Sequence, residues 1–179
     1  AYFSYDSMKS GGLTQSHLRF GDTPIRSTYL VSAADFVACH APTYVKKYDL
    51  TEDLKDGGTF LLNCPWSVEE LETRLPAKMK RDLAAKHAHF YIIDAAKLAA
   101  EAGLGKHTNN ILQAAFFALT KVIPMDVAVA DMKKNNYATY FKKAGQRIVD
   151  LNDKAVDVGV TAAVKVEIPA AWAAAQDVP

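Results

Sequence analysis

Short apolar runs recur along the middle of the chain and are separated by segments of helical spacing. Three such runs are bounded by turn or polar residues, which is typical of strands buried on both faces of a sheet. They lie at 35–40, 59–64 and 89–93. Helix-compatible segments lie between and after them, at 44–54, 67–75, 78–86 and 95–102. Because strands that alternate with helices require crossover connections, this pattern predicts a mostly parallel sheet covered on both faces.

Capping residues mark the ends of several of these helices. Ser67 and Glu70 can form a capping box, in which the Ser67 hydroxyl accepts from the Glu70 amide and the Glu70 side chain returns to the Ser67 amide. Asp94 is placed to cap the helix that follows it. Asp56-Gly57-Gly58 closes the segment that begins at Tyr44. We therefore expect helices to follow the strands that end at Cys64 and Ile93.

The first part of the chain is expected to be rich in strands. Residues 2–6 and 13–20 alternate between apolar and polar positions, so they predict two strands joined by the turn-prone Lys9-Ser10-Gly11-Gly12. A further short strand is expected at 27–31.

The C-terminal half is expected to be helical. Residues 108–122 are apolar nearly all round, and such a helix must be sandwiched between other elements. Further helices are expected at 125–143, 145–149 and 153–164. The predicted fold class is α/β: a three-layer open, mostly parallel sheet with helices on both faces and a helical C-terminal part.

Both ends suggest that the chain is cut from a longer protein. Tyr2 and Phe3 begin a strand-like segment with no polar lead, whereas the termini of natural domains are usually polar and loose. Residues 169–179 carry two prolines around an alanine-rich stretch, which is typical of an exit linker. We therefore expect one domain over 1–168, followed by a linker over 169–179.

Composition narrows the class of protein but names no function. The chain has 179 residues, with 21 basic and 20 acidic side chains and a net charge of +1. The chain therefore has no strong net positive charge that would attract it to nucleic acid or to anionic lipid. No apolar run approaches the roughly 20 residues that span a bilayer, and the first residues carry no secretory signal. We expect a globular cytoplasmic domain with no nucleic-acid partner and no membrane partner.

Few side chains qualify as metal ligands or nucleophiles. Cys39 and Cys64 are too few for a four-ligand zinc site or an iron-sulfur cluster, and each lies in an apolar run, where a free thiol packs as a small hydrophobe. His87 and His89 are two residues apart with no third ligand nearby, and His17 lies in a predicted strand. We expect no metal site and no catalytic residue on this chain.

The turn that joins the first two predicted strands is the clearest candidate for anion binding. Gly11 and Gly12 permit left-handed backbone angles, and successive amides in such a turn can hold an anion. Lys9 adds a positive charge and Ser10 a hydroxyl. Phosphate or pyrophosphate would fit there, although the segment matches neither a Walker loop nor a GxGxxG fingerprint. A plain hairpin turn with a solvated lysine is the alternative.

Two other features are candidates for the same chemistry. Arg19 and Arg26 flank a turn, and each either clamps a phosphate or holds a neighbouring carboxylate such as that of Asp22. Asn63 lies at the carboxyl end of a predicted parallel strand, at the edge where open α/β sheets place their ligands. Amides after Ser67 could bind an anion, but Ser67 also has a complete explanation as a helix cap.

Several long phrases carry a family resemblance. They are AYFSYDSMKSGGLTQSHLRFG at 1–21, PIRSTYL at 24–30, ADFVACH at 34–40 and GGTFLLNCPWS at 57–67, and the similarity continues through VKVEIP at 164–169. With these phrases the chain resembles the gamma-type domain of the pyruvate:ferredoxin (flavodoxin) oxidoreductase family. Gly11 and Gly12 correspond to the Arg/Ser-Gly-Gly motif of that family. The chain lacks the family's thiamine-diphosphate motif, its cluster cysteine runs, and the strand and helix that precede Tyr2 in the gamma domain.

The resemblance implies a reaction for the complete enzyme. That enzyme would decarboxylate pyruvate on thiamine diphosphate, pass electrons through [4Fe-4S] clusters to ferredoxin or flavodoxin, and yield acetyl-coenzyme A. It would act as a homodimer and carry these cofactors on other domains of the same polypeptide. This chain would bind none of them by itself and would be inactive alone.

The resemblance also implies that this chain shapes the coenzyme A or active-site cleft. Coenzyme A carries a diphosphate and a further phosphate, which favour amide nests and basic donors. The residues expected to contact it are Lys9, Ser10, Gly11, Gly12, Arg19 and Asn63.

Two other interpretations stay open at this point. The chain could be a purely architectural module that docks other domains without touching a ligand, which the apolar helix at 108–122 would suit. It could also be a small hydrolase that uses Cys39 or Cys64, although no Cys/His arrangement is legible in the sequence.

Overall fold

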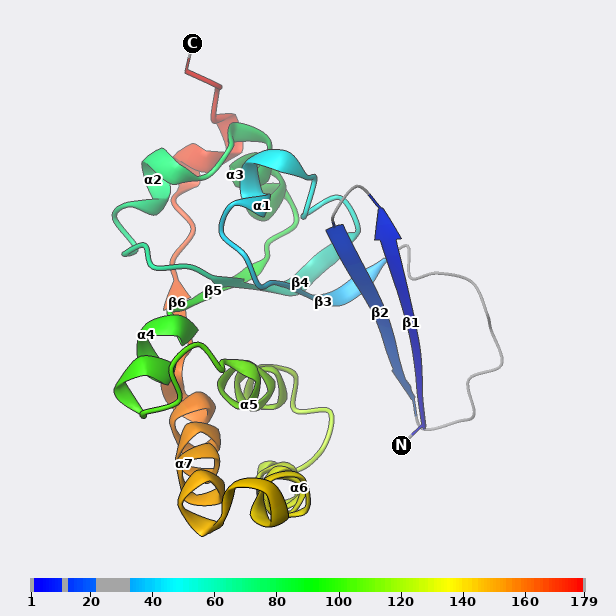
Figure 1. Ribbon diagram of the computed structural model, residues 1–179. Coiled ribbons are helices and arrows are strands. Elements are labelled where there is room, and N and C mark those ends of the chain that lie inside the picture. The colour runs from blue at the N-terminus through cyan, green and yellow to red at the C-terminus, as the bar shows by residue number, and fades with distance from the viewer. Residues whose placement is uncertain (1, 11–12, 22–32, 179) are drawn as a thin grey trace. The chain divides into compact units, whose positions relative to one another are not determined.

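The computed structural model describes residues 2–10, 13–21 and 33–178, and it describes side chains over 33–178. The chain divides by its internal contacts into two units, Ala1–Ala34 and Asp35–Pro179. The first unit contains a β-hairpin, and the second is an α/β body (Figure 1).

The hairpin of the first unit is antiparallel. β1 (Tyr2–Ser10) pairs with β2 (Leu13–Gly21) from Tyr2 opposite Gly21 to Ser10 opposite Leu13. The two strands predicted from alternation are therefore confirmed. β1 is longer than predicted because its pairing with β2 continues through Lys9 and Ser10, which belong to the strand and not to the turn. Gly11, Gly12 and the strand predicted at 27–31 lie outside the described residues.

The second unit is built on a four-stranded sheet with the strand order β3-β4-β5-β6. β4 and β5 are parallel, with Phe60 opposite Phe90, whereas β6 pairs antiparallel with β5. All three predicted strands are confirmed as strands. β4 and β5 carry most of the buried side chains, whereas β3 is an edge strand in which only Cys39 is buried, so the expected burial on both faces is wrong for β3. β6 makes the sheet mixed because the last helix returns the chain along the edge of β5. The strands are β3 (Ala34–Cys39), β4 (Leu54–Asn63), β5 (His89–Ile93) and β6 (Val164–Val166).

Helices cover both faces of this sheet (Figure 1). Side chains alternate along β4, so that Phe60 and Leu62 enter one core cluster and Leu61 the other. The first cluster includes side chains of the short helices α1 to α3, and the second includes side chains of α4, α5 and α7. The predicted open, three-layer α/β fold is confirmed. The first four helices are α1 (Tyr44–Lys47), α2 (Leu71–Arg74), α3 (Ala77–Ala85) and α4 (Ala95–Glu101).

The helical C-terminal part consists of α5 (Asn109–Thr120), α6 (Met125–Ala144) and α7 (Gln146–Ala162). α5 is the predicted sandwiched helix, and its Ile111 and Ala115 are fully buried. Among the described residues, no helix is both long enough and apolar enough to cross a membrane.

Two buried amide side chains connect these three helices. Asn110 of α5 donates to Asn152 of α7 at 2.8 Å, and Asn136 of α6 donates to Asp153 of α7 at 3.0 Å. Because an unsatisfied buried amide is costly, these pairs favour one register of the helices over others.

Three parts of the helix prediction differ from the structure. The segment 67–75 is helical only over α2, because residues 68–70 form a turn that leads into it. The segment 44–54 is helical only over α1, and β4 already begins at Leu54, so Gly57 and Gly58 lie inside a strand. The Gly57 amide donates at 2.6 Å to the carbonyl of Lys86, which follows α3, so a contact with a residue distant in sequence fixes this part of β4 ahead of its pairing with β5. The helices predicted at 145–149 and 153–164 form one helix, α7. Asn152, at the predicted break, donates to the carbonyl of Ile148 at 2.9 Å and is buried.

The residues after β6 pack on α3. The short 3-10 helix η1 (Ala170–Ala174) carries Trp172, which is only 3% exposed and donates its indole N–H to the Glu72 carboxylate at 2.6 Å. That hydrogen bond, together with one from Lys80, lowers the pKa of Glu72. Arg81 donates to the Ala175 carbonyl at 2.6 Å. The segment predicted as an exit linker thus contributes a core side chain, while the domain boundary at residue 168 stays a prediction.

Candidate functional site

The ends of three strands meet at one edge of the sheet, where Asn63 connects them. Asn63 is the last residue of β4. Its side-chain oxygen accepts from the amide of Ala95, which follows β5, at 3.0 Å. Its side-chain nitrogen donates to the carbonyl of His40, which follows β3, at 3.1 Å. Since the carboxyl ends of β3, β4 and β5 lie together, this is the edge at which open α/β sheets bind ligands.

Asn63 acts as a positioning residue in this chain. Both of its side-chain polar atoms are engaged with backbone groups, and they hold the starts of two connections in place. Asp94 caps α4 as predicted and accepts from the Lys97 amide at 3.1 Å. Ser67 accepts from the Glu70 amide at 3.3 Å, as one half of the predicted capping box requires, but α2 begins only after Glu70, so Ser67 precedes the helix by a turn and is not its N-cap. A direct contact between Asn63 and a ligand stays a prediction.

We expect Asn63→Ala to lower the free energy of unfolding by about 1–3 kcal/mol. The substitution leaves the amide of the fully buried Ala95 without its acceptor and the His40 carbonyl without its donor. Urea unfolding followed by circular dichroism measures the change. The control is Asn135→Ala on α6, an exposed position where the change should stay within about 0.5 kcal/mol. Equal values for the two variants would contradict the role given to Asn63.

Two buried thiols lie at the carboxyl ends of β3 and β4, beside Asn63. Cys39 ends β3 and Cys64 follows β4, and both are free and buried. The Cys39 thiol donates to the Ala41 carbonyl at 3.1 Å, and that of Cys64 lies 4.0 Å from the Trp66 carbonyl. Burial raises the pKa of both thiols. Because the thiolate is the reactive form, the structure favours a packing role for them over a nucleophilic one.

His40 belongs to the same edge and was not singled out from the sequence. It is exposed as a residue, but desolvation of its ring lowers the pKa of the imidazole and so favours the neutral ring. Its position directly after a buried strand is the signal that could have identified it.

The residues predicted to bind an anion are distributed over both units. In the hairpin, Lys9 pairs with Thr14 and Ser10 with Leu13, next to the connection between the strands. Arg19 pairs with Ser4, five ladder positions from the Lys9 pair, which corresponds to about 17 Å along the strands. Arg19 therefore does not join Lys9 and Ser10 at the end of the hairpin. Gly11, Gly12 and Arg26 lie outside the described residues, and Asn63 lies in the second unit.

The three histidines considered from the sequence as metal ligands lie in different structural elements. His87 has a left-handed backbone, with φ of 50°, and its ring nitrogen lies 3.2 Å from the Asp56 carboxylate at the surface. His89 begins β5, and His17 pairs with Asp6 in the hairpin. Over the described part of the chain, no three potential ligands are grouped so as to hold a metal ion.

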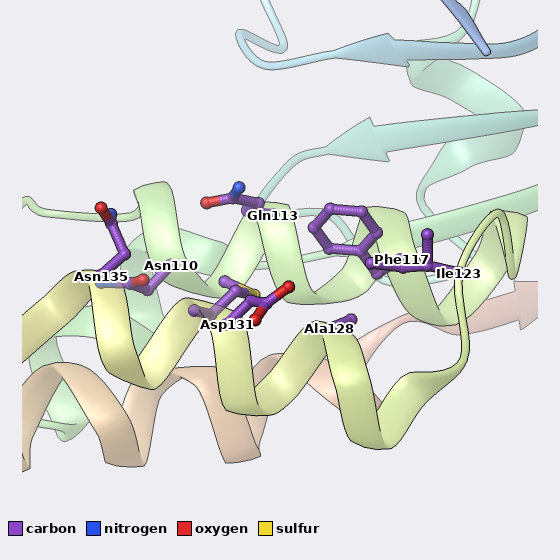
Figure 2. Close-up of a pocket in the computed structure, with 8 residues that line it drawn as sticks. Asn110, Gln113, Phe117, Ile123, Ala128, Asp131 and Asn135 are labelled. Atoms are coloured by element: carbon purple, nitrogen blue, oxygen red, sulfur yellow. The ribbon is translucent and has the colours of Figure 1, made fainter. Parts of the chain in front are cut away.

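A small groove lies between α5 and α6 (Figure 2). Its volume is about 160 Å³. Sites for small organic ligands usually occupy about 300–1,000 Å³, so the groove is too small for a nucleotide-sized molecule. Polar and apolar side chains line it together: Asn110, Gln113, Phe117, Ile123, Ala128, Asp131, Met132 and Asn135.

Known proteins match this chain over nearly its whole length. The family described as pyruvate ferredoxin/flavodoxin oxidoreductase matches residues 1–162. The chain is 51% identical over 177 residues to a pyruvate-flavodoxin oxidoreductase of Enterobacter agglomerans, and 52% identical over 176 residues to a pyruvate:ferredoxin oxidoreductase of Moorella thermoacetica. These alignments cover 99% and 98% of this chain. The chain spans about 15% of the length of each of these curated relatives.

A solved structure shares the fold. The pyruvate oxidoreductase subunit PORC of Thermotoga maritima superimposes with a TM-score of 0.67 at 18% sequence identity. The match covers 93% of this chain and 82% of that subunit.

Proposed function

This chain belongs to the pyruvate ferredoxin/flavodoxin oxidoreductase family, and we propose that it is the segment of such an enzyme that shapes the coenzyme A and active-site cleft. Family membership confirms the resemblance drawn from the sequence. The observation that supports the segment role is the difference in coverage: nearly all of this chain matches, but it makes up about 15% of each relative. The cleft role is supported by the predicted anion-binding residues of the hairpin connection. A part of that size contributes to a larger enzyme and is not expected to catalyse by itself.

The complete enzyme would carry out the oxidative decarboxylation of pyruvate. The pyruvate anion and the thiol of coenzyme A would be converted to acetyl-coenzyme A and carbon dioxide, with release of one proton and transfer of two electrons to ferredoxin or flavodoxin. The two relatives named above are about equally similar to this chain but name different acceptors. Similarity over this domain therefore does not discriminate between the acceptors, which supports placing the acceptor surface on another domain.

The cofactors of that reaction are assigned to other domains. A [4Fe-4S] cluster needs four thiolates, whereas this chain has two cysteines, both buried with raised pKa values. Its residues therefore do not fit a cluster. We place thiamine diphosphate on another domain as well, because the family's motif for it is missing from this sequence. The free cysteines suit the reducing cytoplasm, and a homodimeric complete enzyme belongs to the same proposal.

The proposed contact with coenzyme A lies at the connection of the hairpin. β1 ends at Ser10 and β2 begins at Leu13, so Lys9 and Ser10 stand next to the Gly11-Gly12 pair. Phosphate groups bind well to consecutive backbone amides supported by a lysine and a hydroxyl. Arg19 and Asn63 are weaker candidates, since the first lies farther along the hairpin and the second is engaged with backbone.

We expect Lys9→Ala combined with Gly11→Val to weaken coenzyme A binding to the complete enzyme about tenfold or more. The loss of one charge-assisted contact is worth about 1.5–3 kcal/mol, and each 1.4 kcal/mol is a factor of ten. Calorimetric titration with coenzyme A measures the affinity, and the turnover of pyruvate is measured in parallel.

The matched control for this titration is Lys106→Ala. It removes an exposed positive charge elsewhere on the chain and should leave the affinity unchanged. If the double variant binds coenzyme A and turns over like the native enzyme, the ligand-binding role fails. The purely architectural interpretation would then replace it.

A further inference from the structure

The outer face of α6 carries an exposed apolar stripe. Of the six large apolar side chains that are exposed among the described residues, three lie on this helix: Val127, Tyr137 and Phe141, with exposed fractions of 44%, 50% and 40%. Together with Ala130 and Lys134 they recur at every third or fourth position, which places them on one face. We call these five residues the α6 stripe.

A different face of α6 packs within the chain. Ala128, Met132 and Asn136 are buried, and α6 packs against α5 and α7. Lys133 adds an ion pair with Asp157 of α7 at 2.9 Å. The helix is therefore apolar on two faces, and packing within the second unit uses one of them. An ordinary surface helix is polar on the face that it turns to water.

The two aromatic rings of the stripe lie nearly flat on each other. The ring centres of Tyr137 and Phe141 are 4.5 Å apart, and the ring planes differ by 17°. Aromatic side chains held in this way offer a large apolar area with little conformational freedom left to lose. Tyrosine and other aromatic residues are for this reason enriched at the centres of protein interfaces.

Lys134 lies in the middle of the stripe and indicates the chemistry of the surface that would cover it. Within residues 33–178 it makes no ion pair, whereas the adjacent Lys133 is paired with Asp157. A lysine that is covered by an apolar surface needs a carboxylate, because an unpaired buried charge is costly. The complementary surface is therefore apolar and carries an aspartate or glutamate opposite Lys134.

We propose that the α6 stripe docks against another domain of the complete oxidoreductase polypeptide, through an apolar surface that bears a carboxylate for Lys134. The proposal rests on the proposed function, since it takes this chain as one segment of that enzyme. The relatives extend far beyond the 15% that this chain matches, so most of such a polypeptide lies outside it and is available to cover the stripe. α6 has 20 residues, a length of about 30 Å that suits an interdomain contact.

Carbodiimide cross-linking of the complete enzyme identifies the surface opposite Lys134. The reagent condenses the Lys134 amine with a carboxylate in direct contact and takes up the water that is lost. Mass spectrometry then finds the joined peptides. We expect Lys134 to be joined to an aspartate or glutamate outside residues 1–179. A link to a residue within 1–179, or a link between two copies in a mixture of ¹⁴N- and ¹⁵N-labelled enzyme, would overturn the proposal.

Hydroxyl-radical footprinting of the same enzyme tests whether the stripe is covered. Tyr137 and Phe141 should be oxidised about tenfold more slowly than in the urea-unfolded enzyme. Lys134→Glu should increase their oxidation severalfold, because it places two carboxylates opposite each other. The control Lys46→Glu, at an exposed position of α1, should not. Tyr137 and Phe141 are about half exposed in this chain. If both rings are oxidised in the complete enzyme at about half the rate measured in the unfolded enzyme, no other domain covers the stripe and the proposal is wrong.

The experiments distinguish a failure of the coenzyme A proposal from a failure of the docking proposal. A covered stripe in an enzyme whose coenzyme A affinity does not respond to Lys9→Ala with Gly11→Val would retain the docking surface and remove the ligand-binding role. A free stripe in an enzyme that does respond would do the reverse.

Discussion

Phe90→Ala is expected to lower the free energy of unfolding by about 3–5 kcal/mol. Phe90 lies on β5, one of the two inner strands of the sheet, and is fully buried. Its ring centre lies 5.9 Å from that of Phe60 and 6.5 Å from that of Trp172. Truncation therefore removes contacts to β4 and to the C-terminal segment at once, and it leaves a cavity between them. Urea unfolding of the chain, followed by circular dichroism, measures the loss.

A matched control for Phe90→Ala is Tyr137→Ala, which removes a ring that is half exposed. We expect a loss of at most about 1 kcal/mol there, since only the stacking on Phe141 is affected. A chain of this size loses roughly 2–4 °C of melting temperature per kcal/mol, so the first variant should melt about 6–20 °C lower. Comparable losses for the two variants would mean that the sheet core is not packed as described.

Gly159→Val is expected to destabilise the chain by about 3 kcal/mol, at the upper end for an overpacked site. A Cβ added at Gly159 of α7 would lie 2.5 Å from the Ile111 carbonyl oxygen and 2.8 Å from the Ala114 Cβ, both on α5. The carbonyl belongs to a helix backbone and cannot turn aside as a long side chain could. The two helices must therefore separate, and the neighbouring contacts weaken with them.

Gly159→Ala makes this a sharper test. In the interior of a helix, alanine is normally more stable than glycine by about 1 kcal/mol. At position 159 the contact with Ile111 should reverse the sign, so that the variant unfolds at lower urea concentration than the native chain. Thr161→Ala, at an exposed position of the same helix, should be neutral or slightly stabilising. A stabilised Gly159→Ala would show that α5 and α7 are not in close contact.

Phe90 and Gly159 affect the candidate site because both support the strands whose carboxyl ends form it. Phe90 anchors β5, and Asn63 at the end of β4 accepts from the amide of Ala95, the first residue of α4. The α5–α7 contact at Gly159 supports the other face of the same sheet, because Ile111 shares a core cluster with Leu61 and Ile93. A loss of packing at either site is therefore expected to reach the carboxyl edge of the strands.

Part of the candidate site could be predicted from the sequence. Asn63 is predicted to lie at the end of a strand, because the apolar run at 59–64 stops before Pro65. Its two backbone partners, at His40 and Ala95, could not be predicted, because they come from strands that are brought beside β4 only in the folded sheet. The Asp94 cap and the hydrogen bond between Ser67 and the Glu70 amide are predictable, since each involves an amide three residues away.

Local pattern by itself determined the strands β3, β4 and β5, the sandwiched helix α5 and the α/β class. A run of apolar residues or a helical period is complete within a few neighbouring positions, and these elements follow from it. Only the tertiary structure decided what depends on distant residues: the pairing of β6 with β5, the continuity of α7 through Asn152, the burial of Trp172 and the exposure of the α6 stripe. Each depends on which surface another segment covers, and that is settled by contacts between parts of the chain that are far apart in the sequence.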